Sequence, residues 1–137
     1  MKLMLEVITP EGVAFKDGVD TAVLPTVEGE IGILPGHLPL LTMLEPGEIT
    51  FSQNGQHNSI TIDQGFAQIL SDKISILTEA AIEVSKIDPS KAAEAMAKAE
   101  NALKGFKDKE VDATEIERLE AIIRFSLAQQ MSKNKHR

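Results

Sequence analysis

The sequence changes its apolar period once, near residue 85, and this change restricts the fold to a β part followed by a helical part. Residues 3–80 form short runs in which apolar and polar residues alternate, and turn residues break these runs. This pattern is typical of an all-β sandwich or barrel. From residue 85 onward, apolar residues recur every three or four positions, which predicts helices. A chain of 137 residues suits one domain with an appendage or two compact halves. We therefore expect a β domain at 1–84 and a helical domain at 85–137.

Two hairpins are the clearest features of the β part. One joins residues 48–52 to 59–63, and its Asn54-Gly55 turn supplies the positive φ that tight hairpin turns demand. A second hairpin is expected between residues 66–70 and 74–77. The first run places its apolar residues on one face, and the first hairpin should turn its own toward the core. These residues are Leu3, Leu5 and Val7 of the first run, and Ile49, Phe51, Ile60 and Ile62 of the hairpin.

Prolines and glycines interrupt the apolar residues between positions 19 and 44. Residues 19–24 predict a strand that stops at Pro25. Three glycines and two prolines then divide the stretch 29–41 so densely that no regular helix can form, and a strand could run only as far as Leu34. We expect a shaped surface loop here. Its apolar residues either fold back onto their own core or contact a partner, and the pattern leaves both alternatives open.

The second part of the chain predicts two helices. Asp88 followed by Pro89 is a strong helix start, because aspartate caps free N–H groups and proline is tolerated at the first helical position. Gly105 marks the end of this helix, and residues 112–115 resemble a capping box for the next. The apolar stripes are Ala92, Met96, Ala99 and Leu103 in the first helix and Ile116, Leu119, Ile123 and Leu127 in the second. Because alanine buries little apolar area, we expect an antiparallel hairpin of marginal stability that a ligand or partner could redirect.

The composition argues against several classes of function. The net charge is −7, the sum of −9 for the residues through Val84 and +2 for the rest, and the acidic first half disfavours nucleic-acid binding. The chain has no cysteine and no G-x-S-x-G motif, and its histidines lack metal-ligand spacing. No apolar run could span a bilayer, and the first residues lack the apolar length of a signal peptide. Taken alone, Glu30 is interpreted as a solvated carboxylate and His37 as a turn histidine. A small enzyme that uses surface carboxylates, or a stand-alone adaptor, remain rival interpretations.

Several motifs are more specific than the order of strands and helices. They are Val-Ile-Thr-Pro-Glu-Gly at 7–12, Gly-Glu-Ile-Gly-Ile-Leu-Pro-Gly-His-Leu-Pro-Leu-Leu at 29–41, Pro-Gly at 46–47, Gly-Phe-Ala at 65–67, Leu-Thr-Glu-Ala-Ala at 77–81 and Ile-Asp at 87–88. Together they resemble the epsilon subunit of F-type ATP synthase, called delta in mitochondria, and the resemblance spans the whole chain. It implies a flattened antiparallel β-sandwich or barrel of about ten strands, followed by an antiparallel two-helix hairpin.

The resemblance implies a rotor subunit at the foot of the central stalk that is not itself catalytic. In such proteins the sandwich binds the gamma subunit and the ring of c subunits, and it passes proton-driven rotation to the catalytic head. The implied partner contacts are Glu30 with its neighbour Gly32 for the c-ring, and His37 with Leu41 in the adjoining loop for the stalk. The implied location is the cytoplasmic face of the bacterial plasma membrane, peripherally and without direct membrane insertion.

The family also implies a regulatory role for the helices. They can lie folded on the sandwich or extend along gamma into the head of alpha and beta subunits, where basic residues block ATP hydrolysis. The candidates in this sequence are Arg118, Arg124 and Lys133.

Some bacterial members bind ATP at an Ile/Leu-Asp-x-x-Arg-Ala motif near the first helix, and no other cofactor is implied. Here the matching residues are Ile-Asp-Pro-Ser-Lys-Ala at 87–92, so Lys91 stands where arginine is expected and lacks its planar fork. The candidate ATP contacts are Glu83, Asp88 and Lys91, and the alternative is that Asp88 simply caps the helix.

Overall fold

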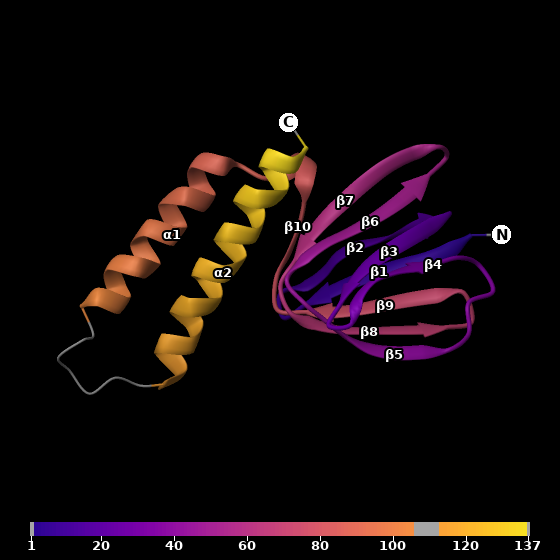
Figure 1. Cartoon of the computed structure of the whole chain (residues 1–137), viewed down its shortest axis with the longest axis horizontal. Coiled ribbons are helices and arrows are strands. Elements are labelled where there is room, and N and C mark those ends of the chain that lie inside the picture. The colour runs from indigo at the N-terminus through magenta and orange to yellow at the C-terminus, as the bar shows by residue number, and fades with distance from the viewer. Residues whose placement is uncertain (1, 106–112, 137) are drawn as a thin grey trace.

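The computed structural model describes residues 2–105 and 113–136, which form a β part and a two-helix part (Figure 1). The strands are β1 (Leu3–Thr9), β2 (Gly12–Val19), β3 (Thr21–Thr26), β4 (Gly29–Ile33), β5 (Leu40–Leu44), β6 (Gly47–Gln53), β7 (Gln56–Ile62), β8 (Gly65–Leu70), β9 (Lys73–Thr78) and β10 (Ala81–Glu83). A short 3-10 helix, η1 (Val84–Lys86), leads to α1 (Pro89–Lys104) and α2 (Ala113–Lys135). The change of period near residue 85 therefore marks the change from strands to helices.

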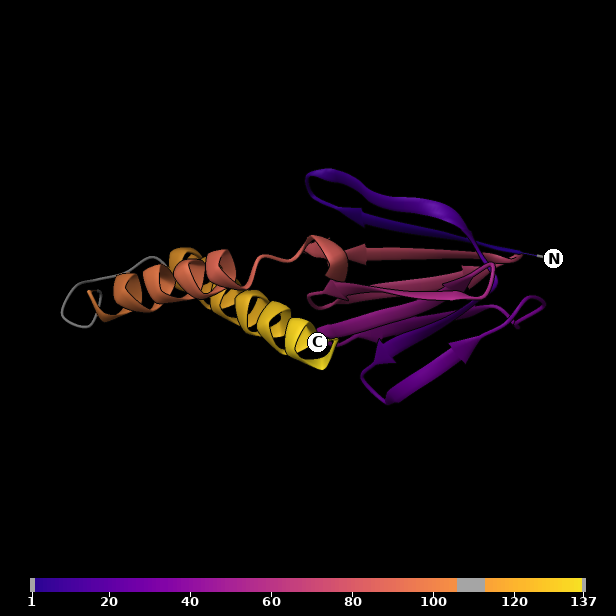
Figure 2. The same ribbon diagram turned by 90° about the horizontal axis from the view of Figure 1, so that it is seen from above.

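The strands belong to one sheet that curls around a shared core. Its order is β10-β7-β6-β3-β5-β8-β9-β1-β2, and β4 pairs with β3. Figure 2 shows the strands in two facing layers. This confirms the expected ten-stranded sandwich, with one difference: β1 and β9 are parallel. These two strands meet only after the sheet has wound around the core, so no tight hairpin forces them to be antiparallel.

The core contains the inward residues of the alternating runs. Those expected to share a buried face do so: Leu3, Leu5, Val7, Ile49, Phe51, Ile60 and Ile62 are all at most 2% exposed. The rings of Phe15 on β2 and Phe51 on β6 lie 4.9 Å apart, and this contact joins strands that are not neighbours in the sheet. Burial of each large aliphatic side chain contributes about 1.5–3 kcal/mol, so the β part holds a substantial core of its own.

Both predicted hairpins are confirmed. Asn54 and Gly55 adopt positive φ between β6 and β7, as a tight turn requires. The turn between β8 and β9 has the same character, with positive φ at Ser71 and Asp72. Gly65, at the start of β8, is required for another reason. A Cβ atom there would lie 2.0 Å from the carbonyl oxygen of Leu77, so the two backbones could not approach as they do.

The prediction that a strand over residues 19–24 stops at Pro25 is wrong. The strand β3 begins at Thr21 and continues through Pro25, which pairs with Glu30 of β4. Proline lacks only the donor side of the ladder, and the carbonyl oxygen of Pro25 still accepts a hydrogen bond from Glu45 N at 2.9 Å. A proline next to the end of a strand is therefore tolerated here.

The helices lie antiparallel beside the sandwich (Figure 1). Asp88 caps α1 as expected, because its carboxylate accepts hydrogen bonds from the backbone N of Ser90 and Lys91 at 2.9 and 3.3 Å. Gly105 follows the last residue of α1. The expected capping box at 112–115 begins at a residue outside the described ranges.

The apolar stripe predicted for α2 is only partly correct. Leu119 is buried, but Leu127 is 45% exposed, whereas Ser126 and Ser132 are buried. The reason is that α2 has two neighbours: it packs on α1, and it also contacts β6, β7 and η1. Its buried surface therefore does not follow the single apolar stripe.

Candidate functional site

The first candidate surface is the segment 29–44, which contains all four expected partner contacts. Glu30 and Gly32 lie exposed on β4, and Leu41 lies exposed on β5. His37 lies half-buried in the loop between these strands, where its Nδ1 donates a hydrogen bond to the carbonyl oxygen of Leu38 at 2.7 Å. Its backbone N donates to the carbonyl oxygen of Leu34 at 3.1 Å, which closes a turn. The four residues thus lie along one segment of the chain, although β4 and β5 do not pair with each other.

Some apolar residues of this segment fold back onto the core, which is one of the two alternatives that the sequence leaves open, and others stay exposed. Ile33 is fully buried, and Ile31 and Leu40 pack partly against the core. However, Leu34, Leu38 and Leu41 are 60%, 79% and 72% exposed. The side chains that fit the alternation of β4 and β5 point inward, while those in the turn and on the outer positions point outward. The loop therefore presents exposed apolar side chains next to His37 in the sequence, whereas Glu30 lies near the start of β4 and lines a hollow with residues of α2.

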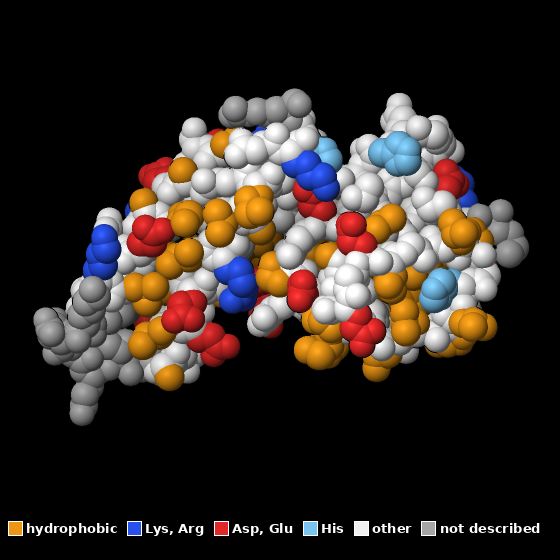
Figure 3. Space-filling model, in the orientation of Figure 1, with side chains coloured by type: hydrophobic (Ala, Val, Ile, Leu, Met, Phe, Trp, Pro, Cys, Tyr) orange, Lys and Arg blue, Asp and Glu red, His pale blue; other side chains and the backbone are white. Residues whose placement is uncertain are grey.

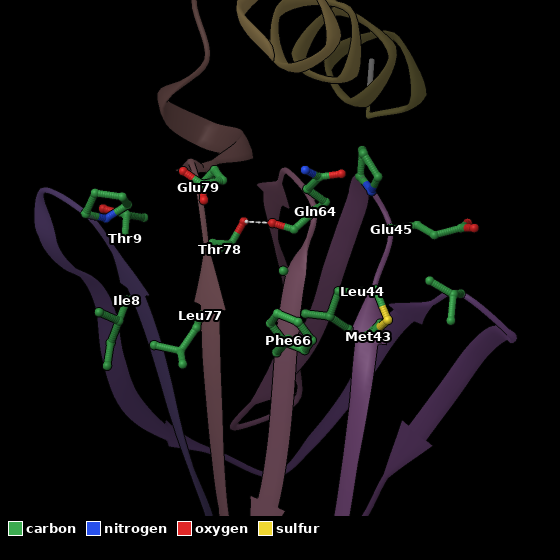
Figure 4. A pocket seen from close by; sticks show the side chains of 14 residues that line it. Ile8, Thr9, Met43, Leu44, Glu45, Gln64, Phe66, Leu77, Thr78 and Glu79 are labelled. Atoms are coloured by element: carbon green, nitrogen blue, oxygen red, sulfur yellow. Dashed lines mark hydrogen bonds between the residues drawn. The ribbon is translucent and has the colours of Figure 1, made fainter. Parts of the chain in front are cut away.

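The second candidate surface is a row of apolar residues across four neighbouring strands, which we call the apolar row: Ile8, Leu77, Phe66 and Met43. The strand register pairs Ile8 with Leu77, Leu77 with Phe66, and Phe66 with Met43. Figure 4 shows their side chains next to one another on β1, β9, β8 and β5. Leu77, Phe66 and Met43 are 54%, 50% and 54% exposed. They border an open hollow of about 580 Å³.

The apolar row continues into a wider apolar surface. Figure 3 shows hydrophobic side chains gathered at the lower edge of the sandwich, where β5 and β8 lie. Contiguous exposed apolar surface of this kind marks interaction sites in folded proteins. Sequence reasoning missed it, although a signal exists. The strands β8 and β9 carry large apolar residues at both inward and outward positions, as Phe66 and Ile69 illustrate.

The third candidate is the contact between α2 and the sandwich, and its centre is an ion pair. Arg124 Nε and one terminal nitrogen donate to the two carboxylate oxygens of Asp63 at 2.6 and 2.8 Å. The Asp63 side chain is 2% exposed and that of Arg124 is 35% exposed. Hydrogen bonding to Asp63 raises the pKa of Arg124, so the guanidinium stays charged. Bidentate pairs of this geometry are among the stronger polar contacts.

Three further polar contacts hold the C-terminal half of α2 and the residue after it to the strands and to η1. Thr61 on β7 donates to the hydroxyl of Ser132 at 2.7 Å, and both residues are buried. Lys133 Nζ donates to the carbonyl oxygen of Val84 at 3.3 Å. His136 Nε2 lies 2.8 Å from a carboxylate oxygen of Glu48. We call these three contacts and the Arg124–Asp63 ion pair the polar latch. Polar groups therefore take part in docking the helix along much of its length.

The structure separates the three basic residues expected to act together. Arg118 pairs with Glu115 on the same helix and is exposed. Arg124 and Lys133 instead belong to the polar latch. Sequence reasoning selected these residues by charge and could not find their partners on the sandwich.

Two of the three candidate ATP contacts are engaged with protein groups. Glu83 pairs with Lys86 at 2.7 Å, and the Asp88 carboxylate caps α1. Lys91 is exposed in the first turn of α1. The capping alternative for Asp88 is thus what the structure contains. Within the described ranges, no group of three or more His, Asp or Glu residues could hold a metal ion.

The polar latch should weaken in acid through Glu48. Burial acts to raise the pKa of Glu48, but hydrogen bonds from His136 and Ser132, with the positive charges of His136 and Lys135, outweigh it, and the pKa lies below its ordinary value of 4.5. A carboxyl group with a lowered pKa contributes stability above its unfolded pKa, and this contribution is lost as the pH falls through the folded pKa. We expect helix docking to weaken as the pH falls below about 4.5.

Energy transfer between dyes on α2 and the sandwich measures docking as a function of pH. Glu48→Gln should flatten the acid part of this pH profile. If the acid part is unchanged in that variant, groups other than Glu48 cause the loss of docking.

Known proteins identify the family of this chain. The family model described as "ATP synthase, Delta/Epsilon chain, beta-sandwich domain" matches residues 2–84. The chain belongs to the ATP synthase epsilon chain family. It is similar to the epsilon chain of Herpetosiphon aurantiacus, with 39% identity over 104 residues, which are 76% of each chain. It is also 33% identical to that of Prochlorococcus marinus over 134 residues, which are 98% of this chain and 100% of the relative.

The epsilon chain fold recurs in a solved assembly. A chain in the Euglena gracilis mitochondrial ATP synthase structure, described as OSCP/F1/c-ring, matches with a TM-score of 0.68 and 22% identity, and the match covers 96% of this chain and 81% of that one. At this identity the likeness concerns the fold. Of the helices in the described ranges, none has the length and apolar character to cross a membrane.

Proposed function

We propose that this epsilon chain is a non-catalytic rotor subunit of the central stalk, with a partner-binding part at 1–84 and a regulatory part at 85–137. The observation that carries the proposal is the exposed apolar row on the sandwich of a family member. The exposed apolar area of Phe66 and Leu77 does not stabilise the chain as a monomer, whereas a permanent partner would bury it. We assign this surface to the gamma subunit.

We assign the whole segment 29–44 to the c-ring, including His37 and Leu41, which the resemblance implied as stalk contacts, because all four expected partner contacts lie along one segment. This segment offers a partner four different groups. They are the carboxylate of Glu30, the bare backbone of Gly32, the imidazole of His37 and the apolar side chain of Leu41. The Euglena gracilis assembly that contains a chain of this fold also contains a c-ring, which supports the assignment. Through both surfaces the chain would couple proton-driven rotation of the ring to gamma. It would act at the cytoplasmic face of a bacterial plasma membrane, as a peripheral component.

The helices are assigned a regulatory role. In the extended form, Arg118, Arg124 and Lys133 would contact the alpha and beta subunits of the head and inhibit ATP hydrolysis. The polar latch supports a reversible arrangement, because the net free energy of a hydrogen bond or ion pair is small compared with that of a continuous apolar interface. Arg124 and Lys133 cannot serve the latch and the head at the same time, so the two forms exclude each other.

ATP as a regulatory ligand is a separate part of the proposal. Lys91 offers a charge without the bidentate geometry of arginine, and Asp88 is committed to the helix cap. Isothermal titration of the full chain with millimolar ATP tests this part, and absence of heat would remove it.

Reconstitution with the remaining synthase subunits tests the main proposal. We expect the chain to copurify with gamma and the c-ring, and removal of residues 87–137 should preserve assembly and raise ATP hydrolysis severalfold. Failure to associate with gamma would contradict the rotor assignment. Unchanged hydrolysis after the deletion would contradict only the inhibitory role.

A further inference from the structure

The loop between β4 and β5 needs a support other than the core. Its side chains Leu34 and Leu38 are exposed, so burial does not hold residues 34–39 in place. Gly36 has a φ of 85°, and the turn is closed locally by His37 N and the carbonyl oxygen of Leu34. A turn of this kind is adaptable unless a second segment fixes it.

That second segment is the turn between β8 and β9. Asp72 Oδ1 accepts a hydrogen bond from Gly36 N at 2.7 Å, although the two residues are 36 positions apart. In the described part of the chain, this is the hydrogen bond that joins residues 34–39 to a segment outside β4 and β5. A carboxylate that accepts from a backbone N–H makes a charge-assisted bond, which is stronger than a neutral one.

Asp72 is itself well fixed. Its carbonyl oxygen accepts from Met4 N at 2.9 Å, so the turn is held to the start of β1. The next residue, Lys73, lies 3.6 Å from Glu6 in an ion pair. Aspartate also tolerates the φ of 59° that this position requires. A rigid turn therefore carries the acceptor that meets the loop.

We propose that Asp72 is a positioning residue that holds the 34–39 loop, and with it His37 and Leu38, in the shape that contacts the c-ring. This inference rests on the proposed function of segment 29–44. A loop that is already ordered loses less conformational freedom when it binds, so Asp72 should raise affinity without touching the partner.

The test compares three variants of the full chain. Asp72→Gly removes the acceptor and keeps the positive φ without strain, while Asp72→Asn keeps an oxygen acceptor at the same place. Ser71→Gly is the matched control, because it changes the same turn at a φ of 50° without removing the acceptor. Hydrogen exchange of the Gly36 and His37 amides measures how firmly the loop is held. Affinity for the gamma–c-ring rotor measures whether the held loop favours binding.

We expect Asp72→Gly to speed exchange at Gly36 about tenfold and to weaken rotor binding by a similar factor. Asp72→Asn should give an intermediate effect, because its neutral amide oxygen makes a weaker bond than the carboxylate, and Ser71→Gly should stay near the wild-type chain in both measurements. Unchanged exchange in Asp72→Gly, equal damage in Ser71→Gly, or faster exchange with unchanged rotor binding would each overturn the inference. If the wild-type chain does not bind the ring, the proposed function fails instead, and exchange at Gly36 alone decides whether Asp72 fixes the loop.

Discussion

Replacement of Phe66 by glutamate should release this epsilon chain from gamma while leaving the sandwich folded. Phe66 lies in the middle of the apolar row and is 50% exposed, so its ring is not part of the core. If gamma covers it, the variant must bury an unpaired carboxylate in an apolar interface. Central aromatic residues of interfaces commonly contribute about 2–4 kcal/mol, which predicts an affinity loss of about 30- to 1,000-fold. Titration with purified gamma measures this loss.

The neighbouring outward residue of β8 provides the matched control. Gln68 is exposed on the same face and pairs with Ser75 and Leu41, outside the apolar row. Gln68→Glu adds the same charge to the same strand, and we expect a change of less than about threefold. Thermal unfolding of both variants should match the wild-type chain. Normal gamma binding by Phe66→Glu would assign the apolar row to a different role.

The second large effect concerns Asp63, whose replacement should release the helices from the sandwich and increase the inhibition of ATP hydrolysis. Asp63→Asn removes the charge that holds Arg124, and a hydrogen bond to a charged group contributes about 1.5–3 kcal/mol. Arg124 is 35% exposed, so water can solvate the released guanidinium. The extended population should rise about tenfold or more. The assembled synthase should then hydrolyse ATP more slowly, because Arg124 becomes available to the head.

Arg124→Gln should give a different result, although it breaks the same pair. It leaves the buried carboxylate of Asp63 without its partner, a loss of about 3–5 kcal/mol, so the helices should undock at least as readily. However, it also removes one proposed contact with the head, and hydrolysis should be faster than in Asp63→Asn. Dyes attached at exposed Gln56 and Leu127, through introduced cysteines in this cysteine-free chain, report docking by energy transfer.

Arg118→Gln is the control for both variants. Arg118 pairs within α2 and does not belong to the polar latch, so docking should be unchanged. Its effect on hydrolysis then reports the head contact alone. Equal hydrolysis in Asp63→Asn and Arg124→Gln would contradict the second role of Arg124. An unchanged energy transfer in Asp63→Asn would contradict the latch itself.

The sequence predicts the elements of this protein because their signals are local. Asn54-Gly55 specifies one turn and Asp88-Pro89 one helix start, and both operate within a few residues. Alternation also assigns the inward residues of most strands. Pro25 shows the limit of such rules: a residue that usually ends a strand is accommodated when its carbonyl oxygen finds a partner elsewhere.

The candidate site is less predictable, because its contacts join distant segments. Arg124 and Asp63 are 61 positions apart, and Gly36 and Asp72 are 36 apart. The apolar periodicity of the sequence predicts neither of these two contacts. The apolar row is a different case. Phe66 and Leu77 look like core residues when composition alone is considered, and only the register places them on the outer face.

The parallel pairing of β1 with β9 determines when the sandwich can be completed. Met4 pairs with Lys73, and Ile8 pairs with Leu77, so the first strand gains its second neighbour only from the last long strand. During synthesis on the ribosome, the β1–β2 hairpin can form early, but one edge of β1 stays open until β9 has left the exit tunnel. Contacts of such high sequence separation slow folding and expose unpaired strand edges in the meantime. The helices that follow are therefore added to a sandwich that can close without them.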